Sequence, residues 1–284
     1  MAYTTIIAAA ALAPLLQDPG IAVIDCRFDL AQPASGREAY LAGHIPGARY
    51  MSLDEDLSAA VAPGTGRHPL PQPDRFAARL GEFGVANDTQ VIAYDGGNGA
   101  FAARLWWMLR WLGAERVAVL DGGYAAWRAA GGAVQSGPAS ITPAVFTPRV
   151  DHGAWVSTSE VCQAIGDPGR ILVDARAPER FAGLIEPIDK VAGHVPGARN
   201  HPFTLNLRAD GRFLEPAQLE RRWRAVLGDA APSTLIAMCG SGVTACHHLL
   251  ALQMAGLGGA KLYAGSFSEW IEDPARPVAR AGAP

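Results

Sequence analysis

The chain consists of two similar halves, and this duplication constrains the fold more than any other feature of the sequence. Four short motifs occur twice, in the same order and at a nearly constant spacing of about half of the 284 residues. They lie at residues 21–25 and 171–174, 43–48 and 193–198, 94–99 and 238–243, and 119–127 and 262–270. Because the period has the size of a domain, it predicts two tandem domains and not a solenoid of short repeats. We place an N-terminal domain at residues 1–132, a linker at 133–155 and a C-terminal domain at 156–284.

Within each half, short apolar runs alternate with longer segments of helical periodicity. The apolar runs include residues 91–94, 117–120 and 235–238, and the helical segments include residues 101–112, 217–227 and 245–255. This alternation predicts α/β domains, each with a central parallel sheet and helices on both faces. The apolar residues 1–16 predict a first helix, and the Pro-rich residues 133–155 predict the linker.

Composition and charge exclude several classes of protein. The chain is 49% hydrophobic with a net charge of -3, and its densest basic cluster is the short segment 221–224. We therefore expect neither a nucleic-acid partner nor a membrane partner. No Lys or Arg precedes Arg27, so the apolar N-terminus is not typical of a signal peptide. The four cysteines form no CxxC pair and no zinc-binding spacing, which predicts reduced thiols, no metal site and a cytoplasmic protein.

Cys239 has the most informative position in the chain. It follows the apolar run 235–238, and a loop of small residues leads from it into a helical segment. In a strand–loop–helix arrangement, backbone N–H groups and the positive end of the helix dipole converge on the cysteine and favour its thiolate. Gly240 and Gly242 let the backbone fold closely around the sulfur. The alternative is a buried structural cysteine.

In the first half, Asp95 takes the place that Cys239 has in the second half. A carboxylate cannot act as a sulfur nucleophile, so we expect only the C-terminal domain to be chemically competent at this loop. The N-terminal copy then has two roles open to it, which are covering its partner domain and lending side chains to the site.

The repeated Gly-His-x-Pro-Gly-Ala motif, the Asp-for-Cys exchange and the Trp-bearing motif that ends each half together resemble the tandem-domain rhodanese superfamily, over nearly the whole chain. The loop from Cys239 to Thr244 is similar to that of 3-mercaptopyruvate sulfurtransferases, because thiosulfate-preferring rhodaneses usually have basic residues directly after the cysteine. The resemblance implies two rhodanese folds and a sulfurtransferase that carries sulfur as a persulfide on Cys239, without a cofactor.

This chemistry fits the residues. A thiolate attacks the donor sulfur, and an acceptor thiol, for example on a thioredoxin-like protein, or cyanide then removes the sulfur. Loop N–H groups would hold the negative charge of the persulfide. The loop residues expected to contact substrate in this way are Gly240, Gly242, Val243 and Thr244.

The resemblance further implies an Asp–His–Ser relay that takes the proton of the substrate thiol. Ser241 matches the serine two residues after the cysteine, and His68 and Asp54 in the first half match the histidine and the aspartate. A carboxylate would fix the tautomer of a neutral histidine that accepts the proton. The alternatives are a surface histidine in a Pro-rich loop and an aspartate that caps a turn.

Arg180 resembles the arginine that binds the substrate carboxylate in this superfamily, and its alternative is a surface ion pair with Glu179 or Glu186. Relatives often have a second arginine directly after a Glu-Pro pair. Here Ile188 follows Glu186-Pro187, and Lys190 is the nearest cation. A lysine offers a point charge where an arginine offers a planar pair of donors.

Other residues that recur or cluster are expected to be structural. The duplicated His44 and His194 serve both domains, so sulfur chemistry does not explain them. Cys246 is expected to be a core thiol without a disulfide to Cys239. Of the neighbouring His247 and His248, we expect one to be buried and one to be exposed.

Three functions remain in view. The sequence favours transfer of sulfur from 3-mercaptopyruvate. The second hypothesis is transfer of sulfur from thiosulfate to cyanide, and the third is a persulfide carrier that delivers sulfur to protein partners. A phosphatase or arsenate reductase would need an arginine at the sixth residue after the cysteine, where this chain has Ala245.

Overall fold

The structure, a computed structural model, describes residues 2–280. It contains two compact units that exchange short segments of the chain. The N-terminal unit comprises residues 2–59, 70–151 and 208–213, and the C-terminal unit comprises residues 60–69, 152–207 and 214–280. A segment from the first half of the sequence, residues 60–69, therefore belongs to the C-terminal unit. The predicted domain boundaries did not include such an exchange, and they stay a prediction.

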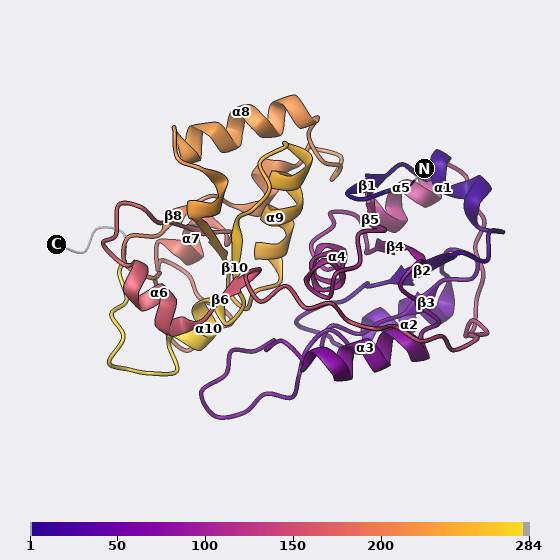
Figure 1. The fold of residues 1–284 in the computed structure, drawn as a ribbon, viewed down its shortest axis with the longest axis horizontal. Helices are drawn as coiled ribbons and strands as arrows, with labels where there is room; N and C mark the ends of the chain where they lie inside the picture. The colour runs from indigo at the N-terminus through magenta and orange to yellow at the C-terminus, as the bar shows by residue number, and fades with distance from the viewer. Residues whose placement is uncertain (1, 281–284) are drawn as a thin grey trace. The chain divides into compact units, whose positions relative to one another are not determined.

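In the described part of the chain, each unit has one sheet of five parallel strands, and the two sheets have the same topology (Figure 1). The N-terminal order is β1-β5-β4-β2-β3, and the C-terminal order is β6-β10-β9-β7-β8. The strands are β1 (Ile6–Ile7), β2 (Ile21–Asp25), β3 (Arg49–Tyr50), β4 (Gln90–Tyr94), β5 (Val117–Leu120), β6 (Trp155–Val156), β7 (Ile171–Asp174), β8 (Arg199–Asn200), β9 (Leu235–Met238) and β10 (Lys261–Tyr263). The repeated order confirms the duplication and the α/β fold class.

Within residues 2–280, ten α-helices connect the strands, with short 3-10 turns at Ala13–Leu15, Phe203–Asn206 and Pro232–Thr234. The helices of the N-terminal unit are α1 (Ala9–Leu12), α2 (Ser35–Ala42), α3 (Pro73–Glu82), α4 (Ala102–Trp111) and α5 (Gly123–Ala129). Those of the C-terminal unit are α6 (Thr158–Ala164), α7 (Pro178–Phe181), α8 (Pro216–Leu227), α9 (Thr244–Met254) and α10 (Ser266–Trp270).

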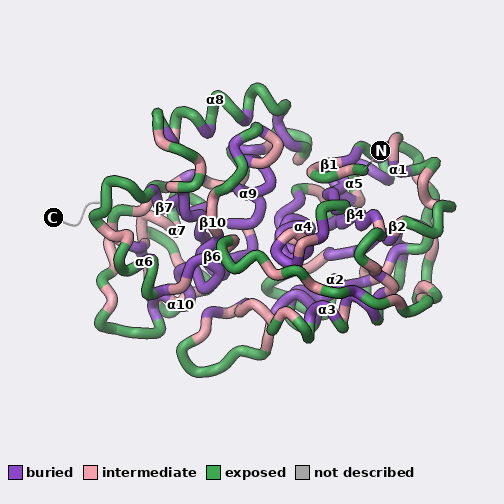
Figure 2. The backbone as a smooth tube through the Cα atoms, in the orientation of Figure 1, coloured by how far each residue is buried: buried purple, intermediate pink, exposed green. Residues whose placement is uncertain are grey.

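Helices cover both faces of each sheet, as the sequence predicted. Alternate strand residues such as Ile92 and Leu120 pack with Trp127 of α5 in one cluster, while α4 packs against β4 and β5. In the C-terminal unit, Ile236 packs with Trp270 of α10, and α9 packs against β9 and β10. The inner strands β2, β4, β5, β7 and β9 are buried along nearly their whole length (Figure 2), which is why they read as continuous apolar runs.

Helix α8 covers α9 and is amphipathic (Figure 1). Leu219, Trp223 and Leu227 are buried at intervals of one helical turn, whereas the basic cluster Arg221, Arg222 and Arg224 is exposed. The basic cluster is therefore a solvated helix face.

Two segments differ from the prediction. The N-terminal residues begin with the two-residue strand β1 before the short helix α1, because Ile6 and Ile7 pair with β5 at the edge of the sheet. Residues 133–151 of the predicted linker are ordered against the N-terminal unit, where Ala144 N–H donates to Gly81 and Phe146 is buried. Among residues 2–280, no helix is both long and apolar enough to cross a membrane.

Candidate active site

Cys239 lies at the carboxyl end of β9, at the edge of a parallel sheet where loops and helix N-termini meet. Its side chain is buried, and its Sγ accepts a hydrogen bond from the N–H of Gly242 at 3.2 Å. Helix α9 begins at Thr244, so its N-terminus follows the loop directly. Gly242 has a φ of 76°, and a Cβ there would lie 2.3 Å from the Ala264 carbonyl oxygen, so only glycine fits. The predicted strand, loop and helix are confirmed.

A second loop, residues 264–268, holds the first one in place. Ser266 Oγ accepts the Cys239 N–H at 3.0 Å and donates to the Tyr263 carbonyl at 2.8 Å. The N–H groups of Phe267 and Ser268 donate to the carbonyls of Cys239 and Gly240. Ser266 is also the one non-glycine residue among residues 2–280 with a positive φ, 51°. Such strain persists where the surroundings determine the conformation, and here it fixes the backbone of the nucleophile.

His68 reaches the Cys239 loop from the segment 60–69. Its Nδ1 lies 2.7 Å from Ser241 Oγ, and both side chains are buried. With Nδ1 unprotonated, the Ser241 hydroxyl donates this hydrogen bond. The segment approaches closely, because a Cβ on Gly66 would lie 2.6 Å from the Gly265 carbonyl oxygen. The structure therefore brings together Ser241 and His68, which lie in different halves of the sequence.

Asp54, the third member of the predicted relay, belongs to the N-terminal unit. It lies in the exposed turn after Leu53, where desolvation and the neighbouring charge of Glu55 raise the pKa of its carboxyl. Its pairing with His68 stays a prediction.

Arg180 lies beside Gly240 and is held by two buried carboxylates. Its Nε and Nη2 donate to Glu186, with the shortest contact at 2.7 Å, and Nη2 also donates to Asp189 at 3.0 Å. The side chain is 18% exposed, so the pair with Glu186 is not the surface ion pair of the alternative interpretation. Both Nη atoms lie 3.7 Å from the point that a Cβ on Gly240 would occupy.

A second guanidinium at this place was not predicted from the sequence. Nη2 of Arg67 lies 2.9 Å from the same Cβ position on Gly240, and Nη1 of Arg67 forms an ion pair with Asp189. Burial lowers the pKa of Arg67; the charge of Cys239 raises it, and the like charge of Arg180 lowers it. The sequence signal that could have identified Arg67 is its position directly before the predicted His68.

Lys190, the cation nearest to the expected second arginine in the sequence, has a different partner. Its Nζ lies 2.8 Å from Glu272, and its side chain is 56% exposed. An exposed lysine of this kind is held weakly.

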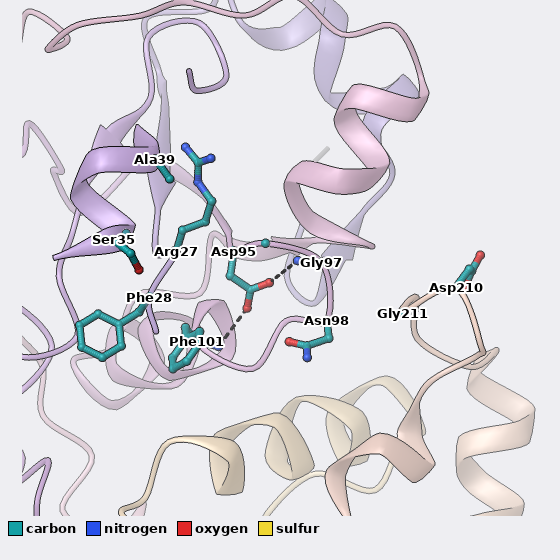
Figure 3. A pocket seen from close by; sticks show the side chains of 12 residues that line it. Arg27, Phe28, Ser35, Ala39, Asp95, Gly97, Asn98, Phe101, Asp210 and Gly211 are labelled. Carbon is teal, nitrogen blue, oxygen red and sulfur yellow. Dashed lines mark hydrogen bonds between the residues drawn. The ribbon is translucent and has the colours of Figure 1, made fainter. Parts of the chain in front are cut away.

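The N-terminal counterpart of the site shows what Asp95 does in place of a cysteine. Its Oδ1 accepts the N–H groups of Gly97 and Gly99, and its Oδ2 accepts those of Phe101 and Ala102. Figure 3 shows the bonds to Gly97 and Phe101. The loop that would hold a substrate-derived anion is thus filled by the chain's own carboxylate.

A cavity of about 470 Å³ lies next to this loop (Figure 3). Ala39 and Asp95 are among its lining residues. Ala39 precedes Tyr40, which stacks on His44, just as Arg180 precedes Phe181, which stacks on His194. The duplication therefore relates Ala39 and Asp95 of the N-terminal unit to Arg180 and Cys239 of the C-terminal unit.

The duplicated histidines have the same structural contacts in both units. His44 Nδ1 hydrogen-bonds the Tyr40 carbonyl and His194 Nδ1 the Phe181 carbonyl, which agrees with their predicted structural role. Cys246 is a buried thiol that donates to the Gly242 carbonyl, in agreement with its predicted place in the core.

The prediction for His247 and His248 was wrong, because both side chains are buried. Their Nδ1 atoms contact the Asn206 amide at 3.3 and 3.1 Å, and His248 Nε2 contacts the His201 carbonyl at 2.7 Å. The 3-10 turn Phe203–Asn206, which follows β8, covers this face of α9. The periodicity of the helix alone does not show that a neighbouring segment covers this face. Among residues 2–280, no group of three or more His, Cys, Asp or Glu side chains is arranged to hold a metal ion.

Comparisons with known proteins agree with this geometry. The family described as "Rhodanese-like domain" matches residues 8–130 and 157–273. Over 281 residues the chain is 50% identical to a probable 3-mercaptopyruvate sulfurtransferase of Pseudomonas aeruginosa, covering 98% of this chain and 99% of that protein. It is 41% identical to a putative thiosulfate sulfurtransferase, SseB, of Mycobacterium tuberculosis, covering 98% of both chains. The solved structure of 3-mercaptopyruvate sulfurtransferase from Leishmania major superposes with a TM-score of 0.82 at 33% identity, covering 94% of this chain and 74% of that one.

Proposed function

The chain belongs to the rhodanese-like domain family, and from this premise we propose that it is a sulfurtransferase that takes sulfur from 3-mercaptopyruvate through a persulfide on Cys239. The observation that carries the proposal is the placement of one buried cysteine sulfur, hydrogen-bonded by a loop N–H, beside the Ser241–His68 pair and two guanidinium groups. The similarity to relatives that are named 3-mercaptopyruvate sulfurtransferases supports this donor.

The first half-reaction forms the persulfide. The Cys239 thiolate attacks the donor sulfur, an S–S bond forms, and the donor's C–S bond breaks with its electron pair passing to the enolate of pyruvate. The donor thiol begins with a proton, which passes to Ser241 while the Ser241 proton passes to His68. Asp54 would hold His68 in the correct tautomer.

The loop stabilises the charge that remains on the protein. The Gly242 N–H already contacts Sγ, and the N-terminus of α9 begins two residues later. Gly240, Val243 and Thr244 complete the loop whose N–H groups would hold the outer sulfur of the persulfide.

In the second half-reaction, an acceptor thiolate or cyanide attacks the outer sulfur and releases the Cys239 thiolate. A thioredoxin-like protein would fit as the acceptor, because its low-pKa thiol is a competent nucleophile. A cytoplasmic location completes the proposal, because the four cysteines form no disulfide among residues 2–280.

Thiosulfate is the second candidate donor. A relative at 41% identity is named as a putative thiosulfate sulfurtransferase. Guanidinium groups bind either donor, since both are anionic. The neutral residues Gly240 and Ser241 and the Ser241–His68 pair favour mercaptopyruvate, because only that donor begins as a protonated thiol. A persulfide carrier for protein partners is the third candidate and would show no turnover with either small donor.

The test is the ratio of kcat/KM values for 3-mercaptopyruvate and thiosulfate, each measured with an acceptor thiol and with cyanide. We expect a clear preference for mercaptopyruvate. A preference for thiosulfate would assign the chain to the second function, and the absence of turnover with both donors would favour the carrier.

A further inference from the structure

We propose that Arg67, together with Arg180, binds the carboxylate of the sulfur donor. This inference rests on the proposed function, because it identifies the group that holds the donor of that reaction. It also explains how the site works without the second arginine after Glu186-Pro187, where the chain has Ile188.

The two guanidinium groups converge on the residue that follows the nucleophile. Nη2 of Arg67 lies 2.9 Å, and the Nη atoms of Arg180 lie 3.7 Å, from the position of a Cβ on Gly240. Because Gly240 has no side chain, both groups can approach the loop beside Cys239. A donor whose sulfur lies at Cys239 would therefore present its other end to this pair of cations.

Two buried carboxylates orient the side chains of Arg67 and Arg180. Asp189 is 2% exposed and pairs with Nη1 of Arg67 and with Nη2 of Arg180, so it joins the two guanidinium groups along one edge. Glu186 accepts from Nε and Nη2 of Arg180. These contacts leave Nη2 of Arg67 and Nη1 of Arg180 directed toward Gly240, within the part of the chain that the structure describes.

Main-chain hydrogen bonds hold Arg67 beside the Cys239 loop. Its N–H donates to Ser268 Oγ at 3.1 Å, and the Ser268 N–H donates to the Gly240 carbonyl at 2.8 Å. The next residue, His68, contacts Ser241. One dipeptide thus delivers a guanidinium and an imidazole to successive residues of the Cys239 loop.

Arg67 also has hydrogen-bonding capacity that the described residues do not use. Its Nε is buried and has no hydrogen-bond partner within residues 2–280. A buried donor without a partner is costly. The carboxylate of the sulfur donor could accept from Nε and Nη2 of Arg67 together, since its two oxygens match the planar pair of donors on one edge of a guanidinium group.

The test compares two donors that differ only in the carboxylate. Mercaptoacetone has a methyl group where 3-mercaptopyruvate has its carboxylate, and both have the same thiol and ketone. We expect Arg67→Met to raise KM for 3-mercaptopyruvate about 10- to 100-fold with little change in kcat, and to raise KM for mercaptoacetone by a much smaller factor. Arg67→Lys should be intermediate, because it keeps the charge that pairs with Asp189 but loses the planar fork. The matched control is Arg224→Met on the exposed face of α8, which should behave as wild type.

Three results would overturn the assignment: equal losses on both donors, no change on either donor, or a KM increase in Lys190→Met with none in Arg67→Met. If the wild type turns over neither donor, binding of pyruvate tests the carboxylate site separately from the proposed reaction. Pyruvate has the same carboxylate as the donor, and its binding can be measured without turnover. Pyruvate should then raise the Tm of wild type but not of Arg67→Met, in which case the proposed reaction fails and the carboxylate site stands. An equal shift in both proteins, or none in either, would contradict the site.

Discussion

Replacing Asp95 by asparagine should destabilise the N-terminal unit without removing sulfur transfer. The Asp95 side chain is 1% exposed and accepts four backbone N–H groups at 2.9 to 3.3 Å. Asparagine keeps one acceptor oxygen and sets an NH2 group against two of these donors. Two charge-assisted hydrogen bonds are then lost, each worth about 1.5 kcal/mol, so the free energy of unfolding should fall by about 3 kcal/mol.

Urea unfolding followed by tryptophan fluorescence measures this change, and Asp88→Asn serves as the control. Asp88 is exposed, so its replacement should change the free energy of unfolding by less than about 0.5 kcal/mol. Turnover by the folded Asp95→Asn protein should persist, because the nucleophile lies in the other unit. Unchanged stability would refute the structural role of Asp95, and loss of turnover with the fold intact would give it a part in the chemistry.

Three further predictions follow from the geometry. Ser241→Ala should lower kcat for 3-mercaptopyruvate about 100-fold in steady-state assays but affect thiosulfate far less, because only mercaptopyruvate gives up a thiol proton; equal losses would contradict the relay. Gly240→Ala should raise KM for mercaptopyruvate about 10-fold with little loss of stability, since its methyl group displaces the flexible end of Arg67; an unchanged KM would place the donor elsewhere. Burial lowers the pKa of His201 from 6.5 to about 4, so the unfolded chain takes up the proton first as the pH falls. Stability should decline between pH 6.5 and 4, by at most about 3 kcal/mol from this group, and a His201→Asn variant should lack that share of the decline in pH-dependent urea unfolding.

The fold could be predicted because the duplication appears in motifs that have local causes. Apolar runs that end at Asp25 and Asp174, and the loop after Met238, repeat in order, so the strand order of one sheet recurs in the other. The two-residue strand β1 was missed because its pairing with β5 comes from the far end of the domain.

Site residues could be predicted where they belong to a sequence motif. They could not be predicted where a contact between distant segments of the chain brings them to the site. Cys239 and Ser241 lie in one loop, and His68 follows from the family resemblance. The role of Arg67 depends on the passage of residues 60–69 into the C-terminal unit, for which the sequence offered no signal besides the adjacency of Arg67 to His68. His248 was misassigned for a similar reason, because the residues that bury it lie more than 40 positions earlier in the chain, at His201 and Asn206.

The most direct test of the central claim is the intact mass of the protein after a short exposure to 3-mercaptopyruvate without an acceptor. Wild type should gain one sulfur atom that an added thiol removes, and Cys239→Ser should gain none and show no turnover. Sulfur bound to the Cys239→Ser variant, or turnover that persists in it, would contradict a persulfide on Cys239.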